Sequence, residues 1–148
     1  MSDSGLTELD KKWFDFTSAY VTKLNEAKQD WYALTEEEQE LAALGKLEMD
    51  MYNGGFLQFF CNWGYDCYLY AVRCLNKMQA TQALGIIQSQ FEIVNRLEGD
   101  ERLQSYLDIY KLLTKEELEK INRIDEDYWH NTDDIMNKTF EIYAHLVQ

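Results

Sequence analysis

The 148-residue sequence contains no proline, seven glycines and two histidines. Average usage of about 5% would give roughly seven prolines, so nothing of this kind interrupts the long segments in which apolar residues recur at helical spacing. His130 and His145 lie fifteen positions apart. No Glu-x-x-His repeat occurs, so no histidine-based metal site is predicted.

Cysteine is scarce as well, and its pattern favours a reducing compartment. Cys61, Cys67 and Cys74 are odd in number, and their spacing fits no zinc pattern. We expect reduced thiols packed as small apolar groups. The longest uncharged stretches, 51–65 and 78–91, are shorter than the ~18 residues that a membrane span needs, and no signal segment opens the chain. These features predict a soluble cytoplasmic protein that binds no membrane.

Cations are few compared with acids. Lys and Arg number 14 and Asp and Glu number 27, which gives a net charge of −13. The first 74 residues carry 13 acids and 6 bases and the last 74 carry 14 and 8, so the excess is not a tail. A protein that binds nucleic acid needs an excess of cations, which this chain lacks. Anionic membranes repel a surface with an excess of acids. The composition therefore excludes direct nucleic-acid binding and favours a basic partner.

Apolar residues make up 46% of the chain and predict a packed core with no strand pattern. Thr35 with Glu38 and Thr114 with Glu117 form capping-box patterns at helix starts. The spacing predicts helices over 6–28, 35–52, 66–78, 81–97, 101–113, 114–128 and 132–147, and a short aromatic segment over 56–62. We therefore predict a single all-α domain over residues 1–148.

No catalytic constellation stands out. The few serines lie in no nucleophile-elbow context, and carboxylate pairs are too common here to single one out. The sequence therefore predicts a protein that is not an enzyme and holds no cofactor or metal. An enzyme that uses carboxylates for catalysis remains a hypothesis, weaker than the two hypotheses of a binding protein given below.

Clusters of acids are the main surface signal. Acids favour the first turn of a helix, and this alone accounts for many of them, together with solubility. The other interpretation is a surface that contacts a basic partner. On that interpretation the candidate residues are Glu36, Glu37, Glu38, Glu40, Glu116, Glu117, Glu119, Asp125, Glu126, Asp127, Asp133 and Asp134.

The most distinctive segment is 53–62, with the sequence NGGFLQFFCN. Two glycines permit a sharp turn and a close backbone approach. The aromatic residues follow at helical spacing and are expected in the core. The side-chain amides of Asn53, Gln58 and Asn62 could stabilise the corner by hydrogen bonds. These residues predict a buried structural corner with an NGG turn, made of Asn53, Gly54, Gly55, Phe56, Gln58, Phe59, Phe60 and Asn62.

This segment resembles the NGGFxQFFxN signature of a bacterial family of small acidic helical proteins, whose characterised type member is a DNA-mimic protein from Neisseria. Similarity extends upstream to the helix ending at Tyr52 and downstream through 124–128 and 133–143. The resemblance implies an all-α fold, often dimeric, that occupies the DNA-binding surface of a protein such as a transcription factor. The alternative is an immunity or antitoxin protein that covers a basic site on a target that does not bind DNA.

Charge density bears on the oligomeric state. B-DNA carries one negative charge per ~1.7 Å, so ten base pairs over about 34 Å carry roughly 20 charges. A monomer with net charge −13 is too weakly charged for such a face, and a symmetric dimer carries twice that charge. We therefore expect a homodimer that acts on a basic DNA-binding protein.

Overall fold

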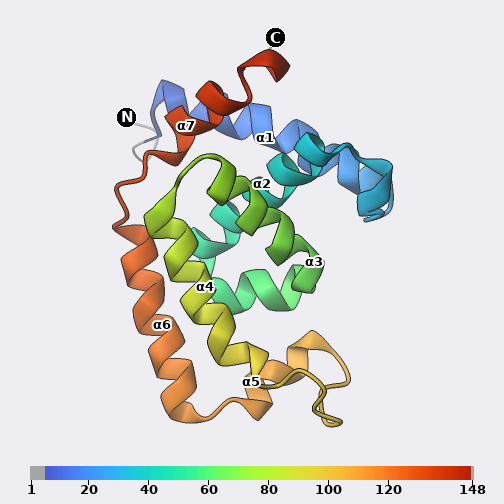
Figure 1. Ribbon diagram of the computed structural model, residues 1–148, viewed down its shortest axis with the longest axis vertical. Helices are drawn as coiled ribbons and strands as arrows, with labels where there is room; N and C mark the ends of the chain where they lie inside the picture. Colours follow the sequence, from blue (N-terminus) through green and yellow to red (C-terminus); the bar gives the residue numbers. More distant parts are fainter. Residues whose placement is uncertain (1–5, 148) are drawn as a thin grey trace.

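The computed structural model describes residues 6–147, and this part of the chain contains α-helices, short 3₁₀ helices and no strand (Figure 1). The prediction of an all-α fold is confirmed. The elements in chain order are α1 Glu8–Glu26, η1 Trp31–Ala33, α2 Glu36–Asn53, α3 Phe56–Lys77, α4 Thr81–Asn95, η2 Tyr106–Asp108, α5 Ile109–Leu112, α6 Lys115–Trp129, α7 Ile135–Ile142 and η3 Ala144–Leu146.

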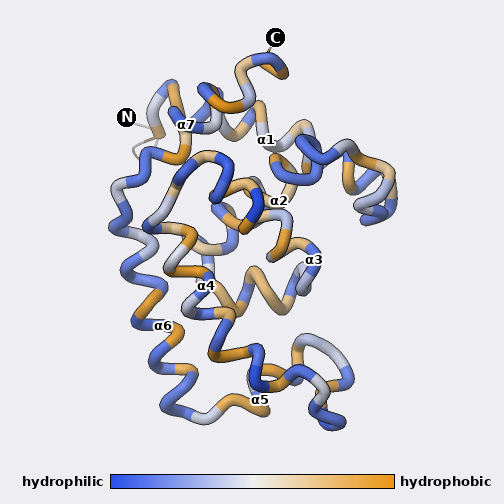
Figure 2. The backbone as a smooth tube through the Cα atoms, viewed as in Figure 1, coloured by the Kyte–Doolittle hydropathy of each residue, from blue (hydrophilic) through white to orange (hydrophobic). Residues whose placement is uncertain are grey.

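Helix α2 is the centre of the packing. Its residues from Gln39 to Met51 are buried with the exception of Met49. It packs against α1 on one side and α3 on the other, and α4 and α6 run side by side along one edge (Figure 1). Phe56, Phe59 and Phe60 at the start of α3 belong to the hydrophobic core, and hydrophobic residues predominate in this part of the helix (Figure 2). No helix within residues 6–147 is long and apolar enough to span a bilayer.

Local capping signals place the helix starts correctly. The side chain of Thr35 accepts from Glu38 N–H at 3.2 Å, and that of Thr114 accepts from Glu117 N–H at 3.1 Å. Each glutamate returns a hydrogen bond to the backbone N–H of its threonine. Both predicted capping boxes are therefore confirmed. They could be predicted because the two residues of each box lie only three positions apart in the sequence.

Asp50 holds the corner between α2 and α3. Its carbonyl accepts hydrogen bonds from the N–H groups of Gly54 and Gly55, each at 2.8 Å. Its carboxylate accepts from Gln58 Nε2 at 2.9 Å and from Trp63 Nε1 at 2.7 Å. The segment thus forms the structural corner that its residues predict.

Glycine is required at the second position of this corner. Gly55 has φ +96°, and a Cβ there would lie 2.1 Å from Oδ2 of Asp125. Phe56, which begins α3, donates its N–H to Oδ1 of the same carboxylate at 3.0 Å. Asn53 and Asn62, by contrast, are exposed and form no side-chain hydrogen bond within residues 6–147, so the ties expected of them are absent.

A second glycine bends α3 between the predicted segments 56–62 and 66–78. Gly64 has φ +83° and ψ −169°, and helix continues on both sides of this kink. A Cβ on Gly64 would lie 2.6 Å from the ring of Tyr106, whose hydroxyl accepts from Tyr65 N–H at 3.3 Å. The chain therefore bends between these two segments, which form one kinked helix.

The prediction of a helix over 101–113 is wrong. Residues 96–105 form turns, followed by η2 and the four-residue α5. Asp100 accepts from the N–H of Arg102 at 2.9 Å within these turns. Ser105 and Asp108 cap a new short turn, which places the Tyr106 ring against α3. Tertiary packing of this ring overrides local helix propensity.

We predict opposite effects of alanine at two glycines. Gly55→Ala should lower the free energy of unfolding by at least about 2 kcal/mol, because it combines positive φ with a clash. Gly85→Ala, in the exposed interior of α4 with nothing within 4 Å of a Cβ, should raise it by about 0.5–1 kcal/mol. Urea unfolding followed by circular dichroism measures both, and a Gly55→Ala protein of wild-type stability would contradict the close approach.

Candidate functional site

The twelve candidate acids do not form one surface. Some are buried inside the fold, some are bound at helix starts, and some are exposed. The buried ones are Glu40, Asp125 and Asp133; the partly exposed ones with internal partners are Glu37, Glu38 and Glu117; the exposed ones are Glu36, Glu116, Glu119, Glu126, Asp127 and Asp134.

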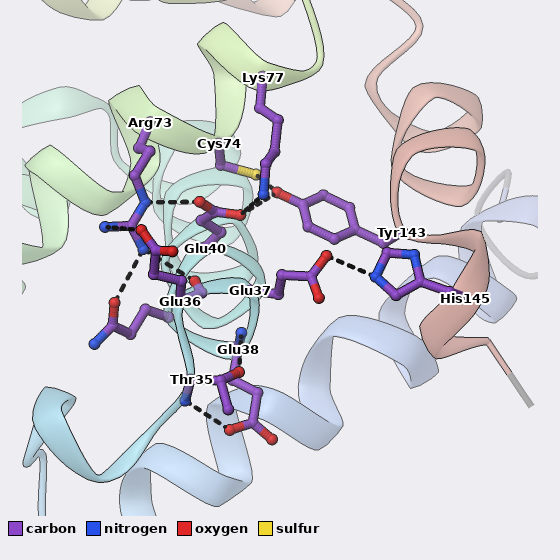
Figure 3. Close-up of polar contacts among 11 residues, drawn as sticks. Thr35, Glu36, Glu37, Glu38, Glu40, Arg73, Cys74, Lys77, Tyr143 and His145 are labelled. Atoms are coloured by element: carbon purple, nitrogen blue, oxygen red, sulfur yellow. Dashed lines mark hydrogen bonds and ion pairs between the residues drawn. The ribbon is translucent and has the colours of Figure 1, made fainter.

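Glu40 ties three parts of the fold together (Figure 3). Its carboxylate accepts from Arg73 Nε at 2.6 Å, Lys77 Nζ at 2.8 Å and the Tyr143 hydroxyl at 2.8 Å. Burial acts to raise the pKa of Glu40, but the hydrogen bonds from Lys77, Tyr143 and Arg73 outweigh it, so the pKa lies below its usual value. With its side chain 2% exposed, Glu40 presents no contact to a partner, and its place in the predicted surface is corrected.

The neighbouring glutamates are bound to other segments as well. Glu38 completes its capping box and forms an ion pair with Lys23 of α1, and the hydrogen bond from Lys23 is the main reason that the pKa of Glu38 is lowered. Oε2 of Glu37 lies 2.7 Å from Nε2 of His145 (Figure 3). Oε1 of Glu36 lies 4.0 Å from a guanidinium nitrogen of Arg73, in an ion pair at the surface in which the Glu36 side chain is 78% exposed. The start of α2 is therefore mainly a junction between segments.

Two further candidates cap helices that lie far away in sequence. Asp125 of α6 accepts from the N–H of Phe56 at the start of α3 and from Gln90 Nε2 of α4 at 2.6 Å. Burial raises the pKa of Asp125. Asp133 accepts from Ala83 N–H at 2.7 Å, in the first turn of α4. Both carboxylates satisfy helix N-termini and are buried, so neither belongs to a contact surface.

The first half of α6 presents a mixed surface. Glu117 forms a two-pronged ion pair with Arg96, at 2.6 and 2.5 Å, whose hydrogen bond lowers the pKa of Glu117 to about 2. Glu116 and Glu119 are exposed. Cations are interspersed with them on the exposed part of the helix, at Lys115, Lys120 and Arg123. This half of α6 therefore has little excess charge.

The last turn of α6 and the start of α7 are different. Glu126, Asp127 and Asp134 are exposed, and none forms an ion pair with a cation of residues 6–147. No lysine or arginine occurs from residue 124 to residue 137. The segment that joins the two helices is hydrophilic throughout (Figure 2). We call Glu126, Asp127 and Asp134 the acidic end.

One acid outside the predicted set is placed unusually. Glu48 is 7% exposed, and its Oε2 accepts from the Tyr128 hydroxyl at 2.5 Å. Burial raises the pKa of Glu48 to about 7, and the hydrogen bond from Tyr128 only partly offsets it. The sequence signal was its position next to Leu47, in the apolar register of α2, where an acid must face inward.

The nucleophilic side chains are inert. Cys61, Cys67 and Cys74 are all free and buried, as predicted. Burial raises the pKa of Cys61 to about 11 and that of Cys74 to about 12, and it raises that of Cys67 further. Thiolates are the reactive form, so none of the three is activated. Within residues 6–147, no three His, Cys, Asp or Glu side chains gather as metal ligands.

We predict that two neighbouring glutamates differ in their effect on stability. Glu40→Gln should lower the free energy of unfolding by about 2 kcal/mol, because it breaks a buried ion-pair network. Glu36→Gln should change it by less than about 0.5 kcal/mol, as is usual for exposed acids. Urea unfolding of both variants at pH 7 tests the contrast, and equal stabilities would contradict a structural role for Glu40.

Glu48 should make stability depend on pH. Its pKa is about 7 in the folded protein and 4.5 is its ordinary value, so the folded state binds the proton more tightly. The free energy of unfolding should therefore fall by about 3 kcal/mol between pH 4.5 and pH 7 on account of this group alone. Glu48→Gln removes this term while retaining an acceptor for Tyr128. Urea unfolding at pH 5 and pH 8 should show that the free energy of unfolding falls less with pH in the variant than in wild type. An equal change with pH in the two proteins would contradict the raised pKa of Glu48.

A comparison of the chain with models of known protein families returns a match. A search of curated proteins and a search of solved structures return no significant similarity. The family model described as DMP19-like protein matches residues 32–146. This range includes α2 to α7, with Asp125 and Asp133, the two aspartates that cap distant helices. The match spans well over half of the chain, and we conclude that this protein belongs to the DMP19-like family.

Proposed function

We propose that this protein is a DNA mimic that occupies the DNA-binding surface of a basic partner, such as a transcription factor. Membership of the DMP19-like family supports the class of function. The observation that carries the proposal here is the acidic end, where three exposed carboxylates have no cation to neutralise them. Such groups are the chain's counterpart of phosphates.

The acidic end suits recognition of cations for two reasons. First, Glu126, Asp127 and Asp134 make no ion pair within the described chain, so a partner need break none to bind them. Second, the net charge of −13 steers a basic protein towards the surface from a distance. A homodimer, also part of the proposal, doubles that charge and offers two such ends related by symmetry.

The partner is identified by release with DNA. The tagged protein captures proteins from a cell lysate at low salt, and duplex DNA elutes what is bound. Release of a basic DNA-binding protein supports mimicry, and mass spectrometry identifies it. A partner that DNA leaves in place would favour the alternative of an immunity-type protein that covers a basic site unrelated to DNA.

With that partner purified, we predict that neutralising the acidic end weakens the complex. The triple variant Glu126→Gln, Asp127→Asn, Asp134→Asn should bind at least about tenfold more weakly at low salt, because three direct charge contacts are lost. Asparagine tolerates the left-handed backbone of residue 134, where φ is +54°. Isothermal titration calorimetry against increasing salt provides the measurement.

The matched control carries the same change in net charge elsewhere. Glu26, Glu98 and Glu101 are exposed and lie at the end of α1 and in the 96–105 segment. Their triple glutamine variant should reduce the association rate only slightly and keep the affinity within about threefold. If both triple variants lose the same affinity, the acidic end is not the contact surface and net charge alone drives binding.

A further inference from the structure

Two adjoining hollows lie where α1, the end of α2 and the start of α7 meet, with α1 and α7 side by side (Figure 1). The larger has a volume of about 640 Å³ and the smaller about 190 Å³. Both are lined by Glu48, Tyr52 and Met136, so they form one continuous depression. We call it the Glu48 hollow.

The walls of the Glu48 hollow are apolar and exposed. Phe14, Met49 and Tyr52 are 38%, 59% and 56% exposed and line the larger part, and Met136 lines both parts. These side chains belong to three separate helices. Exposed apolar groups arranged around a concave site are typical of a binding surface.

The charges that line the hollow are all of one sign. Asp10 lines the larger part, Asp134 lines the smaller part and Glu48 lines both, while no described lining residue is a lysine, arginine or histidine. Asp134 belongs to the acidic end, so the hollow is continuous with that surface. A site with apolar walls, in which acids are the only charged residues of the described lining, is complementary to a cation that carries an aliphatic stem.

Glu48 itself is only partly satisfied. It is 93% buried, since its exposure is 7%, and Oε2 accepts from the Tyr128 hydroxyl. Its second oxygen, Oε1, accepts no hydrogen bond from any residue of 6–147. A buried carboxylate usually has a cation or several donors as partners, and here one side of it faces a hollow. The raised pKa of Glu48 agrees with the lack of a counter-charge.

We propose that the Glu48 hollow binds the side chain of an arginine from the partner protein. The planar guanidinium donates to the free side of the Glu48 carboxylate and stacks on the Tyr52 ring, and the three-carbon stem lies along Met49 and Met136. Identifying the arginine with the partner rests on the function proposed above. The chemistry of the hollow itself is independent of that function.

The first test therefore uses no partner. The intact protein with labelled methionine methyl groups is titrated with n-butylguanidinium at pH 8, where Glu48 is mostly ionised. n-Butanol serves as the neutral probe of the same stem. We expect the guanidinium to shift the Met49 and Met136 signals saturably and n-butanol to bind at least about tenfold more weakly. Equal affinity of the two probes, or no shift up to the solubility limit, would overturn the proposal.

A variant assigns the site to one carboxylate. Glu48→Gln should reduce the affinity for n-butylguanidinium at least about tenfold, whereas the matched variant Glu26→Gln, an exposed acid remote from the hollow, should leave it unchanged. Circular dichroism and the methyl spectrum establish that each variant is folded. A folded Glu48→Gln protein that binds the probe as wild type does would exclude Glu48 as the recognition group.

A second stage separates this proposal from the function. The partner released by DNA is titrated with wild type and with Glu48→Gln at pH 8. A loss of at least about tenfold in affinity supports an arginine of the partner in the hollow. An unchanged affinity would overturn that assignment even if DNA still competes for the partner, and absence of DNA competition would count against mimicry without altering the result of the probe titration.

Discussion

The packing of this protein depends on a carboxylate placed at the start of a helix from another segment. The first turn of α3 has unpaired N–H groups and a partial positive charge, and Gly55 at its N-cap has no side chain to satisfy them. Asp125 does so from α6 and also binds Gln90 of α4, so three helices meet at one charge. Gly55 leaves the space that this carboxylate occupies, which explains in physical terms why the second residue of the corner is a glycine.

The same principle changes the meaning of the net charge. Within residues 6–147 five acids are buried. Asp125 and Asp133 cap helix starts, Glu40 forms ion pairs, Asp50 holds the corner, and Glu48 accepts from Tyr128. Charge acts at long range wherever it lies, so it sets the rate at which a basic protein approaches. A direct contact requires a carboxylate that a partner can reach, either at the exposed acidic end or in the Glu48 hollow. The net charge of −13 and the contact surface are therefore separate properties of the molecule, and the acidic end contributes to both.

How far the sequence predicts this structure depends on the distance between interacting residues. Thr35 and Thr114 find their partners three positions away, so the starts of α2 and α6 could be placed. Asp125 and Phe56 lie 69 positions apart, and no local pattern distinguishes a capping aspartate from a surface one. Tyr106 shows the same limit, because its ring packs against α3 and prevents the helix predicted around it. The fold class followed from periodicity, while the division of acids into buried and exposed required the packing.

In DNA, a narrow minor groove concentrates negative potential and takes up arginine side chains. On our proposals the Glu48 hollow has the same properties, because apolar walls strengthen the field of the carboxylate at its base. It differs from DNA in one respect. Phosphates stay charged near neutral pH, whereas Glu48 has a pKa of about 7 and lies among Asp10, Asp134 and the phenols of Tyr52 and Tyr128, whose own pKa values are raised. A guanidinium bound there would be released by mild acid, so the chain would combine the shape of a groove with a dependence on pH that DNA lacks.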